Sequence, residues 1–386
     1  MSEVRLAVIG VGGMGSYHAG LIQGGKVARC RLTAVCDTDP ERLEPFGGDI
    51  ATFSDHKALL RSGAADAVLI ATPHYPHTPI GIAALQRGVH VLVEKPISVH
   101  KADCERLIAA HRKRKQVFAA MFNMRTEPVY RRVKDLIERG ELGRLTRVIW
   151  IVTNWFRTEH YYASGTWRAT WRGEGGGVLL NQCPHQLDML QWLCGMPSRI
   201  RGFCGFGKFH RIEVEDDVTA YLEYPNGATG VFVASTGEAP GTNRLEISGE
   251  SGKIVVDEAG LRFTRNEVSS REFCRTSPEA FAVPPVWDVR IPVTGTATQH
   301  AGILENFVNA ILDGAPLIAP AREGIRSVEI GNAILFSALT GKPVTLPLDG
   351  VAFERRLKRL IRESGAVRKK AVRRGGGDLT QSFQSR

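Results

Sequence analysis

The sequence lacks any apolar run long enough to cross a membrane, and its opening residues, MSEVRLAVIG, lack the basic and then apolar pattern of a signal peptide. Its composition, with 43% hydrophobic and 23% charged residues, also lacks the bias of disordered chains. The length of 386 residues is enough for two or three domains. We therefore expect a globular cytoplasmic protein with no membrane partner.

Paired cysteines are also missing. The seven cysteines are scattered, and no two of them form a C-x-x-C motif, so we expect neither a disulfide framework nor a zinc knuckle. His185, in the stretch GGGVLLNQCPHQLD, has no second histidine or cysteine at ligand spacing. We expect no metal site.

Positive charge is scarce outside the C-terminal end of the chain. The formal net charge is +10, but residues 351–386 hold eleven Lys or Arg and three acidic residues, so the first 350 residues account for only two of the ten charges. This distribution predicts a basic, disordered tail over residues 366–386 and no basic folded surface. Specific nucleic-acid binding is therefore not expected.

A glycine-rich turn follows the first apolar run. Residues 4–9, VRLAVI, have the length of a buried strand, and GVGGMG follows at once. Gly10, Gly12 and Gly15 fit the G-x-G-x-x-G pattern, in which glycines allow a tight turn, a close approach of backbone to a pyrophosphate and packing of the next helix. A helix expected over residues 16–25 would direct its free N–H groups at the phosphates.

Strands and helices alternate through the first third of the chain. Further strands are expected at residues 31–37, 65–73, 90–96 and 116–122, and helices at residues 77–88 and 98–115. Ser98 is the expected N-cap of the last helix. The alternation predicts an α/β fold with a doubly wound parallel sheet, in which ligands bind at the carboxyl ends of the strands.

Asp37 ends the second expected strand, about twenty residues after the glycines, where an acid accepts hydrogen bonds from the adenosine ribose. A carboxylate there repels a 2′-phosphate, which favours NAD over NADP. Asp37 can also cap a helix that begins at Pro40, and the nearby Arg42 leaves NADP open.

Lys95 ends another strand, where Pro96 favours extended backbone and the lysine would reach toward a nicotinamide. A surface cation is the alternative. The cofactor-binding residues that we expect are Gly10, Gly12, Gly13, Met14, Gly15, Asp37, Thr38, Arg42, Thr72, Pro73, His74, His77, Glu94 and Lys95.

The pattern changes after residue 123. A helix is expected over residues 129–143, a long strand over 144–156, and from residue 198 onward short strands joined by turns, with a hairpin at Asn226-Gly227. This predicts a mostly antiparallel sheet with helices on one face, whose open face would be covered in a homodimer or homotetramer. The expected domains are residues 1–123 for NAD, 124–365 for substrate and assembly, and 366–386 for the tail.

Aromatic and basic residues interleave just before His185. Rings beside arginines suit a sugar, because rings cover its C–H faces while polar groups bind its hydroxyls. A loop whose rings pack against one another is the alternative, and both remain open. The residues in this segment are Trp150, Trp155, Arg157, Tyr161, Tyr162, Trp167, Arg168, Trp171 and Arg172.

His185 lies near the start of an expected helix that begins at Pro184. Leu187, Leu190 and Cys194 form one stripe of this helix, while His185, Asp188 and Trp192 share another face. Two polar groups and one ring would thus face the same way.

The strand followed by GVGGMG, then Glu94-Lys95-Pro96, then the triple glycine with Asn181, His185 and Asp188 resembles the Gfo/Idh/MocA oxidoreductases. The likeness continues through residues 214–230, 244–256 and 305–348, about nine-tenths of the chain. It implies a Rossmann domain, a second α/β domain whose large open sheet mediates assembly, and NAD or NADP used on a sugar, cyclitol or glycoside carbon.

The resemblance also implies roles. Lys95 corresponds to the lysine that bonds the reacting hydroxyl, and His185 to the acid or base. Inositol-dehydrogenase-like members carry an aspartate where this chain has Asn181, so Asn181 is expected to bind a hydroxyl, and Asp188 to orient the imidazole. The expected catalytic residues are Lys95, Asn181, His185 and Asp188, and the expected substrate-binding residues are Arg125, Trp155, Tyr161, Trp167, Arg168, Asn181 and His185.

Three other functions remain open at this point. A retained NAD could oxidise a ring carbon transiently and so permit glycoside cleavage, which would make the protein a lyase or hydrolase. The protein could be a sensor that binds NAD or sugar without catalysis, although a proton acceptor argues against this. The basic tail could bind nucleic acid.

Overall fold

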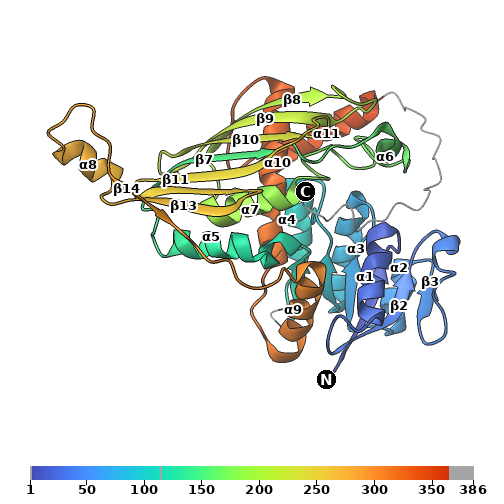
Figure 1. Cartoon of the computed structure of the whole chain (residues 1–386). Helices are drawn as coiled ribbons and strands as arrows, with labels where there is room; N and C mark the ends of the chain where they lie inside the picture. Colours follow the sequence, from blue (N-terminus) through green and yellow to red (C-terminus); the bar gives the residue numbers. More distant parts are fainter. Residues whose placement is uncertain (1, 114, 365–386) are drawn as a thin grey trace.

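The computed structural model describes residues 2–113 and 115–364, which form two sheets with helices packed on them (Figure 1). The tail predicted over residues 366–386 lies outside the described residues. No helix in the described ranges is long and apolar enough to span a membrane.

The first sheet has six parallel strands in the order β3-β2-β1-β4-β5-β6. Its strands are β1 Val4–Ile9, β2 Cys30–Cys36, β3 Ala51–Phe53, β4 Ala67–Ile70, β5 His90–Val93 and β6 Phe118–Ala120. Strand β4 is apolar and buried along its whole length, and β1 is so except at Arg5, as expected of strands that helices cover on both faces. The predicted doubly wound parallel sheet is confirmed.

The helices of this part include α1 Gly13–Gln23, α2 His56–Ser62, α3 His74–Arg87 and α4 Lys101–Ala110, with a short 3₁₀ turn, η1, at Pro40–Arg42. The predicted cap of α4 is wrong. The Nδ1 atom of His100 accepts from the Asp103 N–H, whereas the Ser98 hydroxyl bonds Thr78 Oγ1 at 2.5 Å. The chain stays irregular until residue 100, so Ser98 lies too early to cap the helix.

The second sheet has nine strands in the order β14-β13-β12-β11-β7-β10-β9-β8-β15. The pair β7 and β10 runs parallel, and the other neighbours are antiparallel, as predicted. The strands are β7 Leu145–Val152, β8 Arg199–Phe206, β9 Glu215–Glu223, β10 Thr229–Ser235, β11 Asn243–Gly249, β12 Gly252–Asp257, β13 Gly260–Asn266, β14 Val286–Val289 and β15 Val344–Thr345. The hairpin predicted at Asn226-Gly227 joins β9 to β10.

Helices cover one face of this sheet, which lies above them in Figure 1: α5 Pro128–Glu138, α7 Pro184–Cys194 and α10 Gly324–Thr340. Trp150 and Phe232 point toward these helices and are fully buried. On the opposite face Phe203 and Tyr221 are exposed. The alternation of buried and exposed residues follows the two-residue period of a strand.

Helix α9, Gln299–Asp313, returns to the first sheet (Figure 1). Ile303, Leu304 and Phe307 are buried in the same core as strands β1, β4 and β5. The shorter helices are α6 Glu159–Ala163 and α8 Ser270–Thr276, and α11 Gly350–Glu363 ends the described chain. Residues late in the chain thus pack on the first sheet, and residues of both parts line a cavity.

Candidate active site

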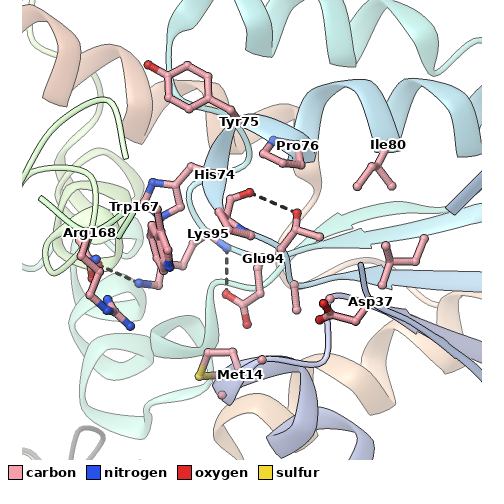
Figure 2. Close-up of a pocket in the computed structure, with 18 of the residues that line it drawn as sticks. Met14, Asp37, His74, Tyr75, Pro76, Ile80, Glu94, Lys95, Trp167 and Arg168 are labelled. Atoms are coloured by element: carbon pink, nitrogen blue, oxygen red, sulfur yellow. Dashed lines mark hydrogen bonds between the residues drawn. The ribbon is translucent and has the colours of Figure 1, made fainter. Parts of the chain in front are cut away.

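A cavity of about 980 Å³ lies at the carboxyl ends of β1, β2, β4 and β5 and is closed on its far side by the segment before α7. In Figure 2, Asp37 lies at one end and Trp167 and Arg168 at the other, with Glu94 and Lys95 between them and Met14 below Glu94. We call these two parts the cofactor end and the substrate end.

Glycines make room at the cofactor end. Gly10 has a φ of +88°, and a Cβ there would lie 2.8 Å from the Thr72 nitrogen. A Cβ on Gly15 would lie 1.8 Å from the Gly10 carbonyl oxygen, so α1 packs on β1 at a distance that only glycine permits. Gly12 and Gly13 line the cavity at the N-terminus of α1. This backbone cradle fits a dinucleotide pyrophosphate.

Asp37 both lines the cavity and holds the glycine turn. Its Oδ2 accepts from the Val11 N–H at 2.9 Å, and Arg42 Nη1 lies 3.6 Å from the same oxygen. The alternative role as a helix cap is wrong, because Asp39 caps η1 through the Glu41 N–H. Asp37 Oδ1 accepts from the Asp39 N–H at 3.0 Å, and the carboxylate lines the cavity with Arg42 against it, where a ribose would lie.

Glu94 is buried beneath the middle of the cavity. Its Oε1 lies 2.7 Å from His18 Nε2, and its Oε2 accepts from the Lys95 N–H at 3.0 Å. Burial alone would raise the pKa of Glu94, but the hydrogen bond from His18 and nearby positive charge lower it to about 2. A fixed negative charge thus lies beside Lys95.

Lys95 reaches from the end of β5 to the substrate end. Its Nζ donates to the Asn181 carbonyl oxygen at 2.8 Å, which leaves two N–H groups for other acceptors. Burial lowers the pKa of Lys95 below its usual value, while Glu94 and Glu174 act in the opposite direction.

Asn181 is held by a carboxylate that the sequence reasoning missed. Its Nδ2 donates to Glu174 Oε1, and its Oδ1 accepts from the Tyr161 hydroxyl at 3.3 Å. Burial raises the pKa of Glu174, which the Arg168 charge partly offsets. The chain therefore places a carboxylate next to Asn181, seven residues earlier in sequence, and no motif spacing could have revealed it.

The rings of the aromatic segment divide between the core and the cavity. Trp150 and Trp171 are buried in the core, whereas Trp155 and Trp167 line the cavity. The Arg168 guanidinium lies 4.7 Å from the ring centroids of Tyr161 and Trp167, and its Nη1 donates to the Tyr161 hydroxyl at 3.0 Å.

His185 lines the same cavity from the first turn of α7. Its Nδ1 is buried and has no hydrogen-bond partner within the described ranges, which leaves Nε2 for the cavity. Burial, and then the charge of Lys95, lowers the pKa of His185 well below its usual value. The ring is therefore neutral near pH 7 and can accept a proton.

The roles expected of Asp188 and Arg125 are wrong. Asp188 does not hold the His185 ring, because its carboxylate is fully buried and accepts from Arg125 Nε at 2.8 Å, from Arg125 Nη2 at 2.7 Å and from Gln191 Nε2 at 3.0 Å. Arg125 is 1% exposed and also pairs with Glu323 at 2.6 Å, so it does not reach the cavity. This ion pair joins α7 to the segment before α5.

The remaining predicted residues fall into two groups. Gly15 lies behind the cavity. His77 lies between the ends of β4 and β5, with its two ring nitrogens 2.9 Å from the carbonyl oxygens of Thr72 and Pro96, and the one N–H of a neutral ring can donate to one of them. The predicted residues that line the cavity are Gly10, Gly12, Gly13, Met14, Asp37, Thr38, Arg42, Thr72, Pro73, His74, Glu94, Lys95, Trp155, Tyr161, Trp167, Arg168, Asn181 and His185. Lining residues that were not predicted include Asn123, Arg157, Gln182 and His300. Of these, only Arg157 carried a sequence signal, its place among the aromatic residues.

Two family models match the chain. Residues 4–122 match the oxidoreductase family with an NAD-binding Rossmann fold, and residues 130–255 match the GFO/IDH/MocA C-terminal domain. The two matched ranges cover both ends of the cavity.

Two characterised relatives span most of the chain. Levoglucosan dehydrogenase of Pseudarthrobacter phenanthrenivorans is 27% identical over 344 residues, which are 80% of this chain and 86% of that protein. The NAD-dependent scyllo-inositol 2-dehydrogenase of Bacillus subtilis is 26% identical over 358 residues, which are 89% of this chain and 96% of that protein.

Solved structures share the same architecture. The WlbA dehydrogenase of Bordetella pertussis, solved with NADH and UDP-GlcNAcA, is 28% identical and superimposes with a TM-score of 0.75 over 90% of this chain and all of that chain. Levoglucosan dehydrogenase in complex with NADH and L-sorbose is 22% identical and superimposes with a TM-score of 0.74 over 90% of this chain and all of that chain. The two chains therefore share the same fold. With its NAD-binding Rossmann domain and its C-terminal sheet domain, the chain belongs to the GFO/IDH/MocA family of oxidoreductases.

Proposed function

We propose that the protein is an NAD-dependent dehydrogenase that oxidises a CH–OH group of a sugar, cyclitol or glycoside. One observation carries this proposal: Lys95 and His185 come from different domains and line the same cavity, beside the strand ends of the cofactor domain. A proton acceptor and a cation next to a nicotinamide site are the groups that alcohol oxidation requires.

The cofactor end favours NAD over NADP. The Asp37 carboxylate would repel a 2′-phosphate, and Arg42 already pairs with that carboxylate, so it is not left to bind the phosphate. When bound, NAD supplies the hydride acceptor. The chain contributes the glycine cradle, which holds the phosphates through backbone N–H groups.

His185 takes the hydroxyl proton through Nε2. The lowered pKa of its ring keeps it in the neutral form that can act as a base. Lys95 donates a hydrogen bond to the same oxygen and so stabilises the alkoxide that develops as the carbon is oxidised. The bond from Lys95 Nζ to the Asn181 carbonyl oxygen directs the ammonium group toward that position.

The substrate end would bind the ring and its other hydroxyls. Trp155 and Trp167 offer apolar ring faces, and Asn181 and Arg168 offer polar groups in defined positions. Glu174 acts as a positioning residue, because its bond to Nδ2 fixes which way the Asn181 amide faces. The sugar and cyclitol dehydrogenases among the relatives support this class of substrate.

The proposal is tested by adding NAD to the purified protein with each of a panel of probes, namely levoglucosan, myo-inositol, scyllo-inositol, D-glucose and D-glucuronate. NADH is followed by its absorbance. We expect one or more probes to give stoichiometric NADH and ketone. If none of them reduces NAD while NADH itself binds, the proposed activity is wrong.

The open face of the nine-stranded sheet supports a homo-oligomer. Phe203 and Tyr221 lie on this face and are 56% and 42% exposed. Large exposed apolar groups on one sheet face are typical of an interface. Light scattering of the wild-type protein and of a Phe203→Glu variant would test this, and a wild-type monomer at micromolar concentration would contradict it.

A further inference from the structure

Arg157 lies in the loop between β7 and α6 and lines the substrate end of the cavity. Its guanidinium carbon is 5.2 Å from the ring centroid of Trp155 and 5.1 Å from that of Tyr161. Its Nη1 donates to the carbonyl oxygen of Phe156 at 3.0 Å. Its Nε is buried and has no hydrogen-bond partner within residues 2–113 and 115–364.

The other cations at this end have carboxylates beside them. Lys95 follows Glu94 directly, and Arg168 Nη1 lies 4.0 Å from Glu174 Oε1. Arg157 has no carboxylate within 4.0 Å in the described part of the chain.

The carboxylates beside Lys95 and Arg168 are engaged in hydrogen bonds of their own. Both oxygens of Glu94 are bonded, to His18 and to the Lys95 N–H. Glu174 accepts from Asn181 Nδ2 and, at 2.6 Å, from the Ala169 N–H. Neither can turn to Arg157 without breaking buried hydrogen bonds, so the charge of Arg157 is left for a ligand.

We propose that Arg157 binds an anionic group of the substrate, and that the substrate is a sugar acid whose carboxylate lies against this guanidinium. This inference rests on the proposed function and names its substrate class. The planar guanidinium, held beside two rings, offers donors in a fork that fits a carboxylate. The Tyr161 ring connects the two sites, because its hydroxyl bonds Asn181 next to Lys95.

A single uncompensated guanidinium matches a single negative charge. A phosphate shares the oxyanion chemistry but carries about two negative charges near pH 7, and the described residues here provide one cation without an acidic neighbour. We therefore commit to the carboxylate and make the phosphate one outcome of the test.

The experiment compares D-glucuronate, D-glucose and D-glucose 6-phosphate as probes, in the wild type and in Arg157→Gln, Arg157→Lys and Arg172→Gln. The measured quantity is the ratio of kcat/KM between charged and neutral probes, which does not depend on the fraction of folded enzyme. Arg172 belongs to the same segment, is exposed and does not line the cavity, so it is the matched control.

We expect the wild type and Arg172→Gln to favour glucuronate by about tenfold or more, the size expected of a charged hydrogen bond. Arg157→Gln should bring the ratio close to one, mainly through KM, and Arg157→Lys should retain part of the preference. A preference for glucose, or a ratio unchanged in Arg157→Gln, overturns the inference. Preference for the phosphate overturns the assignment of a carboxylate.

Calorimetry of the same probes with the NADH-loaded protein separates this inference from the proposed function. If no probe reduces NAD but glucuronate binds through Arg157, the role of Arg157 in binding an anion is supported and the proposed dehydrogenase activity is wrong. If NAD is reduced and glucuronate binds no better than glucose, the proposed dehydrogenase activity is supported and the role of Arg157 in binding an anion is wrong.

Discussion

The two ends of the cavity are built in different ways. The cofactor end consists of strand ends and glycine backbone from one parallel sheet, so its shape follows from local structure. The substrate end consists of side chains from a loop, a short helix and the start of α7, which hold one another through Tyr161, Asn181 and Glu174. Such a construction allows the substrate end to change between relatives while the cofactor end stays the same.

The largest effect should come from the two groups proposed to meet the reacting hydroxyl. His185→Gln and Lys95→Met should each lower kcat by about a hundredfold to ten-thousandfold, because the proton acceptor or the alkoxide partner is lost. NADH affinity, measured by fluorescence titration, should change little. His160→Gln, an exposed histidine in α6, is the control. Wild-type turnover in either variant would contradict their assignment.

A second variant in α7 should affect folding more than chemistry. Asp188→Ala leaves the buried Arg125 charge without its principal partner, and we expect the free energy of unfolding to fall by about 3–5 kcal/mol. Urea unfolding measures this directly. A small loss of stability together with a large loss of kcat would show that Asp188 acts on the reaction after all.

The close packing of α1 on β1 at the cofactor end can be tested with two glycines of α1. Gly15→Ala forces a Cβ into the Gly10 carbonyl, so we expect about 1–3 kcal/mol lower stability and weaker NADH binding. Gly20→Ala lies in the same helix with open space around it and should gain about 0.5–1 kcal/mol. Equal behaviour of the two variants would remove the close-packing explanation.

The smallest effect should come from Glu174→Gln, which we expect to lower kcat by about tenfold. The pH profile is the sharper readout. Oxidation needs neutral His185 and charged Lys95. A plot of kcat against pH should therefore have its acid limb well below pH 6.5 and its alkaline limb below pH 10.5. Because the Glu174 charge raises the pKa of Lys95, its removal should move the alkaline limb to lower pH and leave the acid limb in place. An unmoved alkaline limb would mean that Glu174 is only structural.

The difference between the ends also explains what the sequence could reveal. The glycine turn, Asp37 and Lys95 could be found because each lies at a strand end, and strand ends of a parallel sheet meet at one edge. The second sheet could be predicted because its strands have alternating apolar residues and are separated by turn residues.

The contacts that could not be found are those between distant segments. Helix periodicity placed His185 and Asp188 on one face, but it could not show that Arg125, 63 residues earlier, covers Asp188. The carboxylate beside Asn181 was missed for the same reason, since the bond from Glu174 depends on how the loop folds back.

The measurement that tests the account most directly is transfer of deuterium to NAD from a probe deuterated at the carbon that reacts, read by mass spectrometry. We predict one deuterium in each NADH formed, together with one equivalent of ketone, and the same label at a much lower rate with His185→Gln. Deuterium released to water, or recovered in a cleaved product while no NADH accumulates, would contradict a simple dehydrogenase.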